Sequence, residues 1–284
     1  MTSNTQVVLG SRPSGMPVEA DWEVRVSDAP VADAGEVVVR VDFISIDPAM
    51  RGWLDDRPSY LPPVELGSVM RAGAVGTVVE SRNSALPSGT VVQGMLGVQN
   101  YALSNGDDLE PIDVNVGSAS EYLGVLGSTG LTAYFGLLSH GTPQAGDTVV
   151  VSAAAGAVGS VVGQIARIGG CRVIGIAGSD SKCDIVRGLG FDECINYKTE
   201  NVRERLRELC PRGIDVYFDN VGGWILEAAL ANLARGARVV ICGAISRYND
   251  TESTAGPRNY MNLLVQRATM SGFLVFDHVK EYRK

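Results

Sequence analysis

The segment 149–182 constrains the fold more than any other part of the chain, because it reads as a strand, a glycine-containing turn, a helix and a second strand. The turn has Ala154, Gly156 and Gly159 at the spacing of the G-x-G-x-x-G fingerprint, with alanine in place of the first glycine. Glycine at the second position lets the backbone approach a pyrophosphate, and at the third it lets the helix pack closely on the strand. A pyrophosphate is therefore expected on the amides and positive dipole end of a helix that begins near Ala157.

From about Ser118 onward, apolar strands alternate with helices across short loops. Such alternation predicts βαβ units and hence an α/β fold with a doubly wound parallel sheet covered on both faces. The predicted strands are 149–152, 172–176, 193–196, 215–219, 238–242 and 270–276, and the predicted helices are 158–168, 182–189, 202–209 and 225–233.

The first part of the chain has a different texture, with short β-rich runs separated by proline and glycine turn signals. Strands are predicted at 36–44, 74–80 and 90–95. This pattern favours a mostly β domain of the barrel or sandwich type. We therefore expect two domains, a β domain at 1–125 and a dinucleotide-binding domain at 126–284.

The residues after the second strand of the fingerprint indicate which dinucleotide is bound. NAD enzymes usually have an acidic residue there for the ribose 2′-hydroxyl, but the best-matching position is Ala177. Asp180 follows shortly afterwards and is a rival candidate. Ser179 and Lys182 offer a hydroxyl and an ammonium group, which suit a 2′-phosphate. The pattern favours NADP(H).

The overall composition excludes several classes of function. The formal net charge of −8 argues against a nucleic-acid or anionic-membrane partner. The five cysteines form no C-x-x-C pair and only two histidines are present, so we expect no catalytic metal and reduced thiols in the cytoplasm. The polar N-terminus lacks the apolar core of a signal peptide.

Several segments together resemble a known family, the zinc-independent medium-chain dehydrogenases/reductases, in the branch of prostaglandin reductases, leukotriene 12-hydroxydehydrogenases and alkenal double-bond reductases. The segments that show the resemblance are 45–52, 64–67, 130–138, 153–166, 196–199, 218–223 and 242–249. The resemblance implies a GroES-like catalytic domain at 1–125, a Rossmann domain that binds NADP at 126–284, and an active site in the cleft between them. The loop in which zinc-dependent members have a cysteine ligand has no cysteine or histidine here.

By position, the resemblance also implies which residues hold the cofactor. Thr132 is expected beside the nicotinamide or phosphate end, and Lys182 and Tyr197 at the 2′-phosphate, where the residue pattern already favours Ser179. The remaining residues expected to bind the cofactor are Gly156, Ala157, Val158, Gly159, Asn220, Cys242, Gly243, Ala244, Ile245, Ser246, Tyr248, Phe273, Leu274 and Val275.

The reaction implied by the resemblance is NADPH-dependent reduction of the carbon–carbon double bond of an enone or enal, with hydride transfer to the β-carbon. Without a metal, hydrogen-bond donors must stabilise the enolate oxygen that develops. Tyr248 is the candidate catalytic donor, and the cofactor 2′-hydroxyl or a water molecule is the alternative. Met50, Arg51 and Tyr60 are expected to line the substrate site.

Two other functions stay open at this point. One is an NADPH quinone oxidoreductase of the same superfamily. The other is a cofactor-binding protein with little activity, because family members continue beyond the last Rossmann strand whereas this sequence stops at Lys284, which predicts a C-terminally truncated catalytic domain. A homodimer is expected, with the strand predicted at 270–276 as an interface edge.

Overall fold

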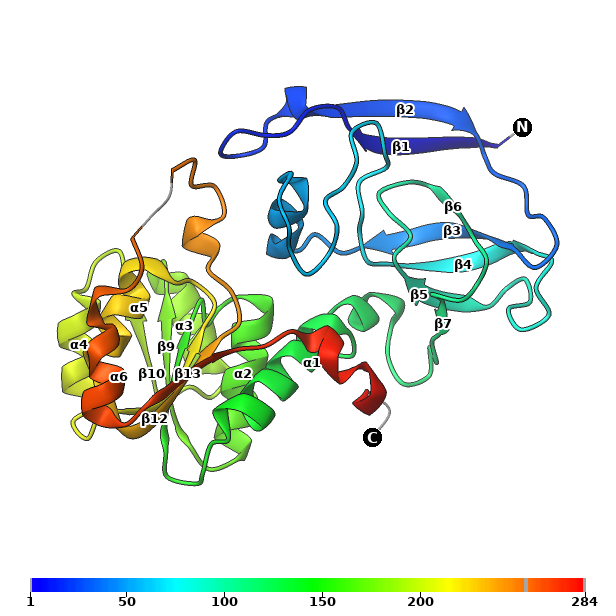
Figure 1. Ribbon diagram of the computed structural model, residues 1–284. Helices are drawn as coiled ribbons and strands as arrows, with labels where there is room; N and C mark the ends of the chain where they lie inside the picture. Colours follow the sequence, from blue (N-terminus) through cyan, green and yellow to red (C-terminus); the bar gives the residue numbers. More distant parts are fainter. Residues whose placement is uncertain (1, 253–254, 283–284) are drawn as a thin grey trace. The chain divides into compact units, whose positions relative to one another are not determined.

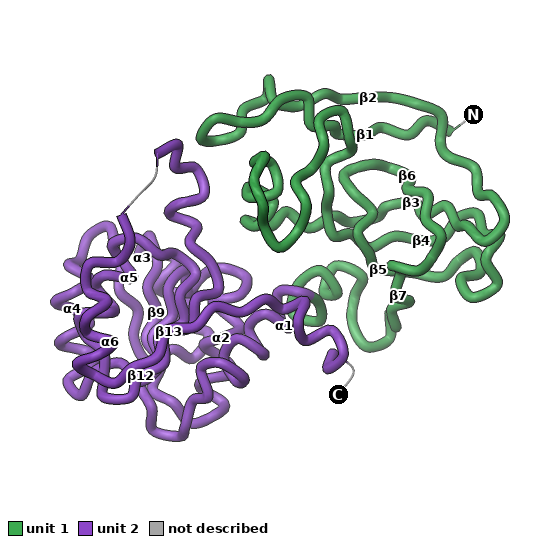
Figure 2. The backbone as a smooth tube through the Cα atoms, viewed as in Figure 1, with its two compact units in different colours: residues 1–127 green, residues 128–284 purple. Residues whose placement is uncertain are grey.

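The computed structural model describes residues 2–252 and 255–282. The chain divides into two compact units, residues 1–127 and 128–284, shown in green and purple in Figure 2. Each unit has its own sheet and its own hydrophobic core, so each is described by itself.

The second unit is built on a six-stranded parallel sheet with the strand order β10-β9-β8-β11-β12-β13 (Figure 1). The order reverses next to β8, which creates the switch point at which doubly wound sheets bind their ligands. The strands are β8 (Thr148–Ser152), β9 (Arg172–Ala177), β10 (Glu193–Asn196), β11 (Ile214–Asp219), β12 (Leu233–Ile241) and β13 (Thr269–Gly272).

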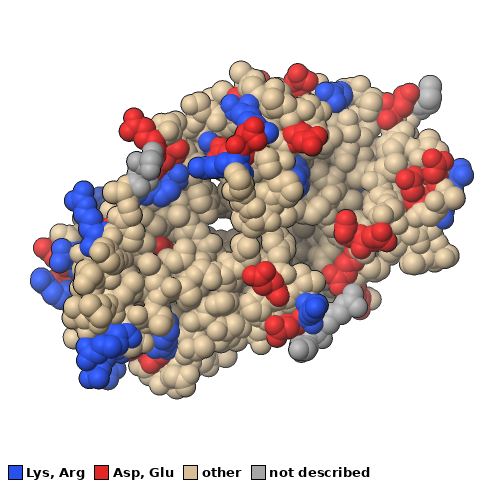
Figure 3. Space-filling model, viewed as in Figure 1, with Lys and Arg blue, Asp and Glu red and all other residues tan. Residues whose placement is uncertain are grey.

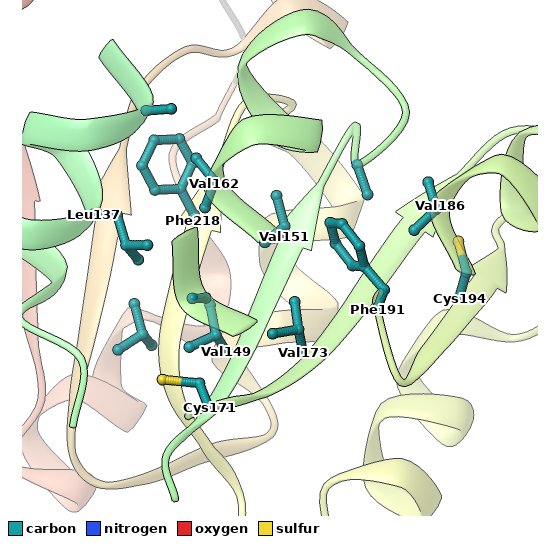
Figure 4. Packing of buried hydrophobic residues seen from close by; sticks show 14 of the residues in the cluster. Leu137, Val149, Val151, Val162, Cys171, Val173, Val186, Phe191, Cys194 and Phe218 are labelled. Carbon is teal, nitrogen blue, oxygen red and sulfur yellow. The ribbon is translucent and has the colours of Figure 1, made fainter. Parts of the chain in front are cut away.

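Helices cover both faces of this sheet. Successive strand residues point to opposite sides, and in β8 the residues on both sides are buried, so each face needs a covering layer. Val149 and Val151 face a core that includes residues of α1, α2 and α3, whereas Val150 faces a core with residues of α4, α5 and α6. Figure 4 shows the first of these cores, with Leu137 and Val162 opposite the valines of the central strands. The helices are α1 (Ser128–Phe135), α2 (Ala157–Ile168), α3 (Asp180–Gly188), α4 (Val202–Leu209), α5 (Gly223–Leu230) and α6 (Met261–Gln266).

The predicted doubly wound α/β architecture is confirmed, but three of its predicted boundaries differ from the structure by three residues or more. The helix predicted at 225–233 ends at Leu230, and Leu233 already begins β12, which is longer than the predicted strand at 238–242. The strand predicted at 270–276 ends at Gly272, because its partner β12 ends at Ile241, the residue paired with Gly272. Val275 and Phe276 lie instead in a 3-10 helix, Val275–Glu281.

The first unit is antiparallel. A ribbon of β1 (Ser3–Leu9) and β2 (Trp22–Asp28) accompanies a five-stranded sheet with the order β6-β3-β4-β5-β7. The predicted strands at 36–44, 74–80 and 90–95 are present. The sheet strands are β3 (Val37–Ile44), β4 (Ala74–Ser81), β5 (Val91–Gly94), β6 (Tyr101–Ser104) and β7 (Glu110–Pro111).

Charged side chains are scattered over the surface. In the view of Figure 3, acidic and basic groups are both seen among a larger number of uncharged residues. In the described part of the chain, no helix is both long enough and apolar enough to span a bilayer.

An ion pair stabilises the 3-10 helix Pro48–Leu54 of the first unit and gives a testable pH dependence. Asp55 accepts hydrogen bonds from Arg51 at 2.7 Å and from Arg57 at 2.5 Å. Burial alone would raise the pKa of Asp55, but the two guanidinium groups outweigh it and the pKa is lowered. A depressed folded-state pKa adds stability above the unfolded-state value of about 3.9, and this stability is lost as the pH falls through the folded-state value.

We expect Asp55→Asn to lower the free energy of unfolding by about 1–2 kcal/mol at pH 7, because one charged partner of partly buried hydrogen bonds is removed. Below about pH 4 the difference from the parent chain should shrink. Urea titrations at several pH values measure both effects. The exposed neighbour Asp56 provides the control, since Asp56→Asn should change little. A difference for Asp55→Asn that does not depend on pH would contradict this account.

Candidate dinucleotide site

The turn after β8 is too tight for a larger residue than glycine at position 159. A Cβ added to Gly159 would lie 2.4 Å from the carbonyl oxygen of Ala153, and a Cβ on Gly156 would lie 3.0 Å from the same atom. Ala153 itself has φ +49°, a left-handed conformation that is strained for alanine. The close approach predicted for Gly159 is thus a backbone contact, and Ala153 makes the sharp bend.

The turn leads directly into α2, which begins at Ala157 as predicted. Its N-cap residue is Gly156, which makes no side-chain cap. The first amides of a helix lack intrahelical partners, and the helix dipole is positive there. The amides of Ala157, Val158 and Gly159 can therefore bind an anion, and the pyrophosphate of a dinucleotide fits this turn.

The residues at the end of β9 favour binding of a 2′-phosphate over binding of a ribose 2′-hydroxyl by an acidic side chain. Ala177 is the last residue of the strand and is buried. The rival acid Asp180 accepts a hydrogen bond from the side-chain amide of buried Asn196 at 2.7 Å. Asp180 therefore has a structural role in fixing the start of α3 to the end of β10.

Ser179 and Lys182 lie at the same end of β9. Ser179 is the N-cap of α3, where its Oγ accepts a hydrogen bond from the Lys182 amide at 3.2 Å. The Lys182 side chain is exposed, as is that of Ser181, whose Oγ lies 3.0 Å from the Oγ of Ser179. Two hydroxyls and an ammonium group therefore lie within four residues at the start of one helix, a suitable donor set for a 2′-phosphate.

Tyr197 directly follows β10, and its ring lies beside the backbone that follows β9. A Cβ on Gly178 would lie 2.8 Å from the Tyr197 hydroxyl, so the ring lies against the backbone there. The ring also meets Trp224 edge-on, with the centroids 6.0 Å apart. Trp224 was missed by the sequence reasoning, and its only signal was a large aromatic residue directly after the two glycines that end the loop behind β11.

The loop behind β11 is fixed to the end of β8. The side-chain amide of Asn220 donates to the carbonyl of Ser152 at 2.7 Å, and its backbone amide donates to the Ser152 hydroxyl at 2.8 Å. Asn220 is therefore held at the switch point, and a contact with a cofactor would add to these bonds.

The loop behind β12 contains the predicted residues Cys242 to Tyr248. The amide of Ala244 donates to the Tyr248 hydroxyl at 3.3 Å, and Ser246 Oγ donates to the Val221 carbonyl at 2.6 Å. Ile245 is exposed. Burial, with a contribution from Asp219, raises the pKa of Cys242 to about 12, so its thiol is neutral at physiological pH. A Cβ on Gly243 would lie 2.8 Å from the Tyr248 hydroxyl.

Among the remaining predicted cofactor residues, Thr132, Phe273 and Leu274 are half-buried and Val275 is buried. The Thr132 hydroxyl donates to the Ser128 carbonyl within α1 at 2.6 Å. The ring of Phe273 packs against the buried side chains of the second unit, 5.1 Å from the ring of His140. Val275 is buried, and Leu274 precedes the last 3-10 helix.

The three residues predicted to line the substrate site all belong to the first unit. Met50 is buried in its core. Arg51 is bonded to Asp55 and donates to the Gly15 carbonyl at 3.0 Å. The Tyr60 hydroxyl accepts a hydrogen bond from the Trp53 indole at 3.2 Å, and the residue is 44% exposed.

The predicted cofactor residues share one position in the fold. In the second unit, all the predicted cofactor residues except Thr132 follow the carboxyl end of a parallel strand, where open α/β sheets bind ligands. Among the described residues, no group of three or more histidine, cysteine, aspartate or glutamate side chains could hold a metal ion.

Family descriptions match a segment of each of the two units. Residues 5–112 match the family described as the N-terminal domain of oxidoreductase, and residues 157–284 match the family described as zinc-binding dehydrogenase. The chain is 43% identical to the NADPH-dependent curcumin reductase of Escherichia coli, over 96% of this chain and 80% of that protein. It is 42% identical to prostaglandin reductase 1 of Mus musculus, over 92% of this chain and 78% of that protein.

A solved structure shows the same fold with a nucleotide bound. CurA from Vibrio vulnificus in complex with NADPH is 43% identical to this chain and superposes with a TM-score of 0.92, covering 98% of this chain and 85% of that one. The chain therefore belongs to the zinc-independent medium-chain dehydrogenases/reductases, in the branch that contains the curcumin and prostaglandin reductases.

Proposed function

We propose that this protein is an NADPH-dependent reductase of the carbon–carbon double bond in α,β-unsaturated ketones and aldehydes. The observation that supports it most is the pairing of two features at neighbouring strand ends. One is the Gly159 turn, which has no room for a side chain, and the other is the donor set of Ser179 and Lys182 behind β9, where the nearby acid Asp180 is already bonded to Asn196.

Different groups of residues behind the strands would hold different parts of the cofactor. The amides at the start of α2 bind the pyrophosphate, and Ser179, Lys182 and Tyr197 bind the 2′-phosphate. Asn220 and the loop 242–248 lie farther along the same edge of the sheet, beside the ribose and nicotinamide. When bound, NADPH supplies the hydride that is transferred to the β-carbon of the substrate.

The protein must then stabilise the negative charge on the substrate oxygen and provide for the proton. We assign the hydrogen bond to that oxygen to Tyr248, whose phenol is held in its loop by the Ala244 amide. Because the bond from Ala244 fixes the phenol before the substrate arrives, little reorganisation is needed during the reaction.

A panel of substrates tests the proposal. Oxidation of NADPH is followed with an enone, an enal, the corresponding saturated ketone and a quinone. Consumption with the enone and enal, together with a saturated product, is expected. Turnover of the quinone alone would instead favour the quinone oxidoreductase function, and NADPH binding without any turnover would favour a cofactor-binding protein.

Lys182→Ala should weaken NADPH binding by roughly 10- to 100-fold and leave NADH binding nearly unchanged, since only NADPH has the 2′-phosphate that the ammonium meets. Dissociation constants for both nucleotides measure this. Arg187→Ala on the same helix is the matched control, because its guanidinium pairs with Asp184 at 3.0 Å. Equal losses for NADPH and NADH would contradict the assignment of Lys182.

We further propose that two chains associate through the edge of the second unit, and that the protein acts in the cytoplasm, where its five free thiols remain reduced. β13 is an edge strand, and the adjoining α6 exposes Met261, Leu264 and Val265. Light scattering should give twice the chain mass. Leu264→Asp should then produce monomers, and a parent chain that is already monomeric would overturn the homodimer.

A further inference from the structure

A buried carboxylate lies behind the proposed cofactor loops and has no assigned role so far. Asp219 is the last residue of β11 and is 0% exposed. Its Oδ1 accepts hydrogen bonds from the Ser152 hydroxyl and the Tyr217 hydroxyl, both at 2.9 Å. The amides of Val221 and Gly222 donate to the same carboxylate at 3.0 Å. A buried carboxylate is costly unless donors of this kind surround it.

The same residue also anchors the loop behind β12. The carbonyl oxygen of Asp219 accepts hydrogen bonds from the Cys242 amide at 2.9 Å and the Gly243 amide at 3.1 Å. The Ser152 hydroxyl that donates to the carboxylate accepts from the Asn220 amide in turn. Asp219 is therefore bonded to the last residue of β8 and to the loops that follow β11 and β12.

The partners of this carboxylate are neutral groups. Between the described residues, none of the ion pairs involves Asp219. Burial and the adjacent carboxylate raise the pKa of Tyr217, which keeps its phenol protonated as a donor. The negative charge is thus balanced by oriented dipoles, and those dipoles belong to the loops themselves.

We propose that Asp219 is a positioning residue for the cofactor. Its carboxylate, which also accepts from Tyr217, holds Asn220 through Ser152 and holds Val221 through its amide; the carbonyls of Asn220 and Val221 in turn accept hydrogen bonds from the Ile245 and Ser246 amides and so hold the loop 242–248 in the arrangement that the nicotinamide half of NADPH requires. This inference rests on the proposed function, because it assumes that these loops meet the cofactor. The carboxylate has no contact with solvent, so it does not take part in the chemistry directly.

Tyr217→Phe is the most informative variant, because it removes one donor to the carboxylate and keeps the aromatic ring in the core. We expect it to raise the KM for NADPH about tenfold, the change expected when one hydrogen bond to a charged group is lost. The isotope effect on kcat with NADPH deuterated at the transferred position should also increase. A purely structural defect would lower the amount of active enzyme and leave both quantities unchanged.

Asp219→Asn should have a larger effect in the same direction, since an amide group must then face donors. The matched control is Asp215→Asn at the opposite end of β11, where Asp215 accepts from the Thr148 amide at 2.8 Å. Asp215→Asn should change the stability of the fold and leave the KM for NADPH and the isotope effect unchanged. Folded Tyr217→Phe and Asp219→Asn variants with the parent KM and isotope effect would overturn the inference.

Hydrogen exchange separates failure of this inference from failure of the proposed function. Without any nucleotide, Tyr217→Phe should speed amide exchange in 220–223 and 242–248, and Asp215→Asn should not. A parent chain that fails to bind NADPH would sink the proposed function, whereas the exchange result decides the positioning role in either case. Unchanged exchange in both loops would overturn it.

Discussion

Gly159→Ala is expected to abolish detectable NADPH binding, with a loss of at least about 100-fold, because the phosphate turn cannot keep its shape. The added Cβ would lie 2.4 Å from the Ala153 carbonyl oxygen and 3.0 Å from the Ala154 Cα. These are backbone atoms, so the turn or the helix must move, at a cost of about 1–3 kcal/mol. Alanine recovers about 1 kcal/mol through its helix propensity. The net change in stability is therefore small beside the loss of binding.

Gly188→Ala is the matched control for this substitution. Gly188 is the last residue of α3, and a Cβ there meets no atom within 4 Å. The Gly188→Ala variant should bind NADPH as the parent chain does, and its free energy of unfolding should be higher by about 0.5–1 kcal/mol. Isothermal titration and thermal unfolding of both variants give the comparison. If Gly159→Ala binds NADPH as the parent chain does, the turn does not hold the pyrophosphate.

Tyr248→Phe should lower kcat for an enone by about 100-fold, the usual loss when one preorganised donor to a developing oxyanion is removed. The KM for NADPH should stay close to that of the parent chain, since the ring remains in the loop. Tyr260→Phe is the control, because Tyr260 is an exposed tyrosine of the same unit. Steady-state kinetics with saturating NADPH measure both. An unchanged kcat for Tyr248→Phe would assign the donor role to water or to the cofactor ribose.

The sequence predicted those parts of the fold in which side-chain patterns and backbone structure agree. The valines of β8 are buried on both faces, and a run of this kind indicates a central parallel strand. The helices α2 and α4 have the expected bounds because their apolar positions repeat at the helical period. The boundary at Gly272 depends on where β12 ends, and that is a property of the partner strand.

The candidate site was predictable as a set of positions but not as a set of contacts. The glycine spacing located the turn, yet the left-handed residue is Ala153, and no propensity favours alanine there. The sequence leaves Asp180 as a rival ligand for the ribose, and only the tertiary structure shows that it is bonded to Asn196. Asp219 was visible only as part of a family segment, because its bonds join residues 67 positions apart in sequence, as in the pair with Ser152.

Transfer of deuterium to an enone from NADPH that carries deuterium at both C4 positions of the nicotinamide tests the central claim most directly. The product is analysed by mass spectrometry and by NMR. The account predicts a saturated ketone with one deuterium at the β-carbon. The Tyr248→Phe variant should form the same labelled product at a lower rate. An allylic alcohol with deuterium at the former carbonyl carbon, or label that stays in the nucleotide, would contradict it.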